Sequence, residues 1–134
     1  MRILKLFYGI GSIISLVNGA WMLLFPFSWY TDFPAAIPHT GPFNAHFIRD
    51  LGVVFILAAL GFSWCALHPD RCRVTRRVLT IFFVGHALIH FADIVTGRIP
   101  HTHWLIDAPT VFVPAILLTI LEISPVRKYL GESS

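Results

Sequence analysis

The sequence predicts an all-α integral membrane protein, folded as a four-helix bundle with both termini in the cytoplasm. Hydrophobic residues make up 56% of the chain and charged residues only 13%, whereas a typical soluble domain carries about 25% charged residues. The mean hydropathy is +0.73, and the apolar residues fall into four long runs. The expected partner is therefore the lipid bilayer and not nucleic acid, and we expect one domain over residues 1–134.

Each apolar run is close to the length that crosses a bilayer. About 17–25 helical residues cross roughly 30 Å of hydrocarbon, and helices are expected because lipid offers no partner to an unpaired backbone. In the last run we expect Asp107 to cap the helix, Pro109 to lie in its first turn and Pro114 to kink it. The four predicted spans cover residues 4–27, 43–67, 78–95 and 108–123.

Basic residues indicate the orientation of these spans. Eight of the ten precede the first span, separate the second from the third, or follow the fourth, and this asymmetry places both termini in the cytoplasm, in our prediction of a bacterial inner membrane. Cys65 and Cys72 fall near the same reducing side, so no disulfide is expected. The eight residues are Arg2, Lys5, Arg71, Arg73, Arg76, Arg77, Arg127 and Lys128.

Small residues recur every four positions in the first span, at Gly11, Ser15 and Gly19. This spacing lets another helix approach closely, although small residues are also common in membrane helices in general. The partner helix could belong to the same chain or to a second copy, so a homo-oligomer or a larger membrane complex stays open.

Histidines and acids collect at the end of the bundle opposite the basic residues. His86, His90 and Asp93 are spaced i, i+4 and i+7, which puts them within about 60° of one helix face. His46 and Asp50 form an i, i+4 pair on the neighbouring span. Ionisable residues at this depth normally face the bundle interior and indicate a functional site.

These five residues predict a transition-metal site. Neutral imidazoles and carboxylates suit Zn, Fe or Cu(II), and the metal would serve metal handling or a metal-dependent redox or hydrolytic step. Whether the protein is an enzyme stays open, because the sequence offers no separate nucleophile. Secondary candidates for the same site are His101, His103 and Asp107.

Other interpretations of the polar residues remain. They could be structural contacts between helices, a path for protons or small molecules, or a haem site with His46 and His90 as axial ligands. A further alternative is a non-catalytic accessory or assembly subunit of a membrane complex. Taken alone, His39, His101 and His103 are expected to be solvated loop residues.

The chain also resembles small four-helix bacterial membrane proteins of unknown function, of the DoxX-like and DUF4345-like families. The resemblance rests on Leu23-Leu24-Phe25-Pro26 at the end of the first span, on the entry Ile48-Arg49-Asp50-Leu51-Gly52 into the second, and on the basic loop before the third. It covers most of the chain and implies a four-helix bundle. It does not extend to His86, His90 and Asp93, so the metal hypothesis rests on the residues alone.

Overall fold

A computed structural model describes residues 2–130, and all regular secondary structure within this range is helical. Three helices are long and apolar enough to cross a membrane, as an integral membrane protein requires. The elements in chain order are α1 (Arg2–Leu24), α2 (Pro26–Asp32), η1 (Ile37–Thr40), α3 (Ala45–Leu67), α4 (Arg73–Val95), α5 (His103–Ile106), η2 (Ala108–Phe112), α6 (Val113–Ile120) and α7 (Ser124–Tyr129).

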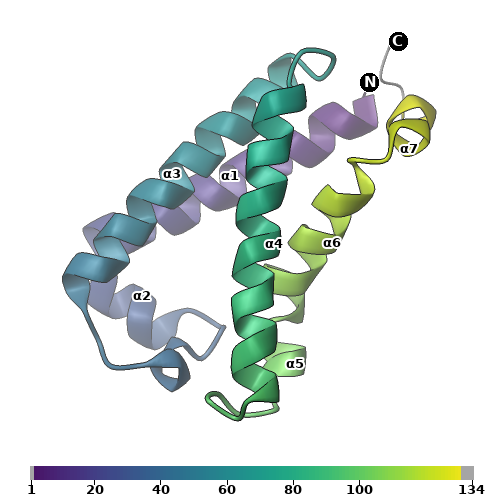
Figure 1. The fold of residues 1–134 in the computed structure, drawn as a ribbon. Coiled ribbons are helices and arrows are strands. Elements are labelled where there is room, and N and C mark those ends of the chain that lie inside the picture. Colours follow the sequence, from purple (N-terminus) through teal and green to yellow (C-terminus); the bar gives the residue numbers. More distant parts are fainter. Residues whose placement is uncertain (1, 131–134) are drawn as a thin grey trace.

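The helices form two pairs (Figure 1). Helix α1 lies along α3, and α4 lies along η2 and α6. The amino terminus, the turn between α3 and α4, and α7 gather at one end of the molecule, while α2, η1 and α5 gather at the other. We call the first the turn end and the second the loop end. A core of buried apolar side chains, among them Leu4, Phe62, Phe83 and Leu118, joins the two pairs.

Helix ends coincide with residues whose local chemistry stops or caps a helix. Helix α1 ends at Leu24, three residues before the predicted end of the first span, because Pro26 has no N–H to continue the helix and instead begins α2. The Asn44 side chain accepts a hydrogen bond from the Phe47 N–H at 3.1 Å and so caps α3. Helix α4 stops before Gly97, whose φ of 72° favours glycine.

The segment predicted to be the fourth span differs from the three long helices. The apolar segment Ala108–Ile120 is shorter than they are, and it opens with a π-helical turn in which the Asp107 carbonyl accepts from both Val111 and Phe112. This widened turn directly precedes Pro114, which cannot donate a backbone hydrogen bond. Asp107 occupies the expected capping position, but its side chain makes no capping bond.

Helices α1 and α3 approach closely through small residues. A Cβ placed on Gly19 would lie 2.8 Å from the Gly52 carbonyl oxygen, and one on Gly11 would lie 3.1 Å from the Phe62 ring. Ser15, between the two glycines, is buried at 3% exposure. The side of α1 that carries these three residues therefore packs on α3 of the same chain.

We expect Gly19→Ala to destabilise the protein by about 1–3 kcal/mol, because the added methyl group would meet backbone and force the two helices apart. The matched control is Gly9→Ala on the same helix, where an added Cβ meets nothing within 4 Å. That variant should lie within about 1 kcal/mol of the wild type, since alanine is the better helix former. Unfolding in a denaturing detergent, followed by circular dichroism, measures both; equal losses would contradict the close approach.

Candidate functional site

A buried carboxylate organises the loop end. Asp107 has no solvent exposure, and its Oδ2 lies 2.7 Å from Nδ1 of His90, on α4. Nδ1 of His103, which begins α5, lies 3.1 Å from both carboxylate oxygens. His103 is also fully buried, so the acid and its second imidazole partner are sealed from solvent together.

The hydrogen bonds extend from His103 to the surface. Nδ1 of His39, on η1, lies 3.1 Å from Nε2 of His103, and the His39 residue is exposed. An ionised carboxylate only accepts, so in the state with Asp107 ionised Nδ1 of His103 and of His90 each carry a hydrogen. The Nε2 of a neutral His103 is then an acceptor, and His39 donates to it through Nδ1.

His86 continues the arrangement toward the middle of α4. Its ring lies edge-on to the His90 ring, with the centroids 4.6 Å apart. Phe82 stacks against His86 on its other side, with the rings 6° from parallel. We call the five residues His39, His103, Asp107, His90 and His86 the His–Asp network. The network begins at the exposed His39 and ends inside the bundle at His86, which packs against the apolar ring of Phe82.

The metal-site prediction is wrong. Within residues 2–130, no group of three or more histidine, cysteine, aspartate or glutamate side chains is arranged to hold a metal ion. Of the five predicted ligands, only His86 and His90 belong to one cluster. Nδ1 of His90 is hydrogen-bonded to Asp107, so the carboxylate and the imidazole that a metal would need are already bound to each other.

The other three predicted ligands have separate partners. Asp93 binds Arg98, with Oδ1 and Nη1 3.2 Å apart. His46 and Asp50 contact each other at 3.4 Å on the surface of α3, where their side chains are 89% and 65% exposed. The haem hypothesis, which used His46 and His90, stays a prediction.

The three histidines of the loop end differ in exposure and in bonding, which the sequence did not predict. His101 is exposed, as predicted, whereas His103 is fully buried and His39 bonds to it. The i, i+4 spacing of His103 and Asp107 could have indicated their pairing, because it is the spacing of His46 and Asp50. Nothing in the sequence around His39 indicates its contact, which depends on how the 33–44 segment folds back.

A second polar cluster lies toward the turn end and was not predicted. Arg76 is 2% exposed, and its Nε lies 3.2 Å from Oε1 of Glu122, just beyond α6. Thr80 donates to the same oxygen at 3.3 Å, and Arg77 lies 3.7 Å from Oε2. This charge pair, buried at Arg76 and partly exposed at Glu122, joins α4 to the end of α6.

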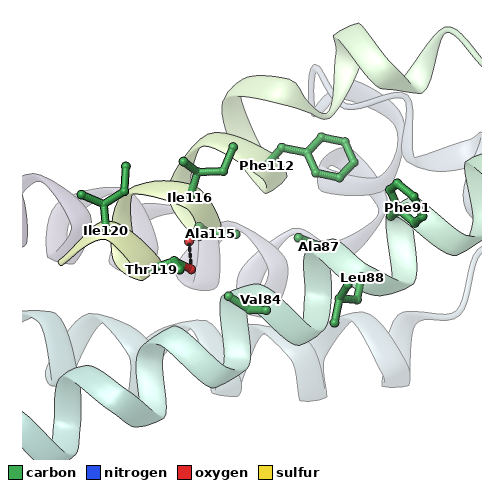
Figure 2. A pocket seen from close by; sticks show the side chains of 9 residues that line it. All are labelled: Val84, Ala87, Leu88, Phe91, Phe112, Ala115, Ile116, Thr119 and Ile120. Carbon is green, nitrogen blue, oxygen red and sulfur yellow. Dashed lines mark hydrogen bonds between the residues drawn. The ribbon is translucent and has the colours of Figure 1, made fainter. Parts of the chain in front are cut away.

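An apolar groove of about 310 Å³ runs between α4 and the η2–α6 segment (Figure 2). The hydroxyl of Thr119 is its polar group, and that hydroxyl donates to the Ala115 carbonyl at 2.8 Å. The groove therefore offers packing surface but no polar group to orient a ligand. Its lining residues are Val84, Ala87, Leu88, Phe91, Phe112, Ala115, Ile116, Thr119 and Ile120.

We expect Asp107→Asn to destabilise the protein by about 1–3 kcal/mol, because an amide presents N–H donors to imidazoles that must themselves donate. The matched control is Asp93→Asn, which breaks a partly exposed ion pair with Arg98 and should cost at most about 1 kcal/mol. Detergent unfolding compares the two. A larger loss for Asp93→Asn would contradict the central position of Asp107.

Comparison of this chain with protein-family models, with curated proteins and with solved structures gives no match.

Proposed function

We propose that this protein is a four-span protein of the bacterial inner membrane that takes up a proton from the outer side and holds it in the His–Asp network. The observation that carries the proposal is the fully buried Asp107 carboxylate, shared by two imidazoles from different elements. In this proposal the shorter apolar segment Ala108–Ile120 is the fourth span, and both termini are cytoplasmic.

The distribution of basic residues supports this orientation. The turn between α3 and α4 carries Arg71, and Arg73 begins α4 directly after it. This turn lies at the same end as the amino terminus and α7. Cytoplasmic loops carry an excess of lysine and arginine. The His–Asp network lies at the opposite end, where it would meet the periplasm.

The hydrogen-bond directions support uptake at His39. A proton that binds Nε2 of His39 releases the hydrogen on its Nδ1 to Nε2 of His103, and His103 in turn passes its own Nδ1 hydrogen to Asp107. One carboxylate and four neutral imidazoles carry one negative charge, so a single added proton leaves the network neutral. A neutral network is the less costly one to bury.

The same directions indicate storage of the proton. Nδ1 of His90 already carries a hydrogen that points at Asp107, so this nitrogen cannot accept the proton. Onward transfer requires the His90 ring to turn over first. After the transfer Nδ1 of His103 has lost its hydrogen and accepts from the protonated Asp107, whereas Nδ1 of His90 still donates to it. The proton therefore stays on the carboxyl group.

Charged groups around the network are paired with one another. On α4, Asp93 faces Arg98, and on α3 the exposed His46 faces Asp50. On α2, Asp32 accepts hydrogen bonds from Thr31 and Ser28, which hold its pKa below the usual range and keep it ionised. The imidazoles that contact Asp107 are therefore His90 of α4 and His103 of α5, and His39 of η1 is connected to it through His103.

Nuclear magnetic resonance of nitrogen-labelled imidazoles during a pH titration tests the proposal. We expect His90 and His103 to titrate in shared steps, because coupled groups show macroscopic behaviour that belongs to the set. Asp107→Asn should separate their titrations and leave His46 unchanged, whereas the control Asp50→Asn should change His46 alone. If His90 and His103 titrate independently in the wild type, the network is a structural clasp and the proposal fails.

The orientation predicts opposite labelling at two exposed histidines, His68 beyond α3 and His101 before α5. Each is replaced by cysteine in a Cys65→Ser/Cys72→Ser background. A membrane-impermeant maleimide applied to cells with a permeabilised outer membrane should label His101→Cys but should reach His68→Cys only after lysis. The reverse pattern would overturn the orientation.

A further inference from the structure

Three guanidinium groups gather around one glutamate at the turn end. Nε of Arg76 lies 3.2 Å from Oε1 of Glu122, and Nε of Arg77 lies 3.7 Å from Oε2. Arg127 reaches the same residue from α7 and donates through Nη1 to the Glu122 carbonyl at 2.7 Å. We call these four residues the arginine cluster. Its three positive charges outweigh the single carboxylate, so the cluster as a whole is cationic.

The apolar groove between α4 and the η2–α6 segment begins directly beside this cluster. The carbonyl of Thr119, which lines the groove, accepts from the Glu122 N–H at 3.0 Å. On α4, Thr80 donates to Oε1 of Glu122 at 3.3 Å, and Val84, four residues after Thr80, lines the groove. One end of the groove therefore lies next to the arginine cluster.

Arg77 lies on the side of α4 that forms one wall of the groove. At about 100° per residue, it falls within about 20° of Val84 and Leu88, which line that wall. The Arg77 side chain is 56% exposed. A guanidinium has five N–H donors, so Arg77 can contact Glu122 and a second anion at the same time.

In a bilayer, this arrangement puts charge and apolar surface at the depths that a phospholipid needs. Arg77 lies in the second turn of α4, where its long side chain can reach the polar headgroup region, a layer roughly 5–7 Å thick on each side of the hydrocarbon. Val84 lies about 10 Å farther along the helix, at hydrocarbon depth. The buried Ala87 and Ala115 lie between the larger side chains of the two walls, which leaves room for an unbranched chain (Figure 2).

We propose that the groove and the arginine cluster together bind one anionic phospholipid. One acyl chain packs between α4 and α6, and the phosphate binds Arg77, whose planar guanidinium matches phosphate oxygens in a bidentate contact. The charges of Arg76 and Arg127 add to the attraction. This inference requires that α4 crosses the bilayer, but it is independent of the proposed proton uptake and of the side that the turn end faces.

Charge favours a lipid over a second copy of the chain as the occupant of the groove. Copies inserted in one membrane share an orientation, so a twofold contact through the groove would bring two cationic clusters side by side. Like charges placed together at an interface are costly. A lipid phosphate instead brings a negative charge to the cluster, and its acyl chain needs no hydrogen bond from the groove.

Mass spectrometry of the intact full-length protein tests the headgroup contact. The protein in detergent is mixed with equal amounts of phosphatidylglycerol and phosphatidylcholine that carry the same acyl chains, and the lipid adducts are compared. We expect phosphatidylglycerol adducts to dominate. Arg77→Gln should lower this preference by roughly fivefold, the effect of one basic residue near an anionic lipid, whereas Arg77→Lys should keep most of it. The matched control is Arg71→Gln, which removes the same charge from the exposed turn before α4 and should leave the preference in place.

Photolabelling of the wild-type protein in vesicles tests the groove and does not depend on how a variant folds. The probe is phosphatidylglycerol with a diazirine in the middle of one acyl chain. We expect labels on groove-lining side chains in the tryptic peptides 78–98 and 99–127, because cleavage follows Arg77, Arg98 and Arg127. Excess unlabelled phosphatidylglycerol should suppress these labels, and excess phosphatidylcholine should not.

Four outcomes would overturn the proposal. The wild type could bind both lipids equally. Arg71→Gln and Arg77→Gln could lower the preference equally, which would show that the turn end attracts lipid only through its total charge. Labels could spread evenly over the exposed apolar faces of α1, α3 and α4. Chemical cross-linking could instead join these two peptides between copies, which would make the groove a contact within a dimer.

Discussion

The Asp107 carboxylate is the group on which the loop end depends. It lies at the junction of α5 and η2, its side chain holds His90 of α4 and His103 of α5, and its carbonyl accepts the two backbone bonds of the widened turn. Without partners, a buried carboxylate would be costly. Through His103 the same interaction reaches His39, so a single acid connects three separate segments of chain.

The lipid environment explains why the polar residues form closed groups. Hydrocarbon offers no hydrogen bonds, so each buried polar side chain needs a partner from the protein. At the loop end these partners are imidazoles and a carboxylate, and toward the turn end they are Arg76, Glu122 and Thr80.

The sequence predicts the long helices well because their signals are local. Apolar run length, Pro26 and Gly97 determine where helices begin and end, and α3 ends at its predicted residue. The candidate site could be predicted from the sequence only in part. Periodicity correctly put His86 and His90 on one face of the helix. The partners of a side chain, however, depend on other segments of the chain. Asp93 binds Arg98, five residues later, and Asp107 binds His90. No spacing rule relates residues 39 and 103, because their contact follows from the path of a loop.

The position of the two polar clusters along α4 decides what each can do. Residues 81–85 between them are Ile-Phe-Phe-Val-Gly, and this stretch, from Thr80 to His86, spans about 9 Å of helix without an ionisable side chain. Phe82 stacks on His86 and Phe83 lies in the core, so these rings close the inner end of the network. In the proposed uptake, a proton that enters at His39 therefore has no continuing path along α4 toward Glu122. The proposal then requires the proton to leave by the route through which it entered, unless a second protein or a change in helix packing opens another.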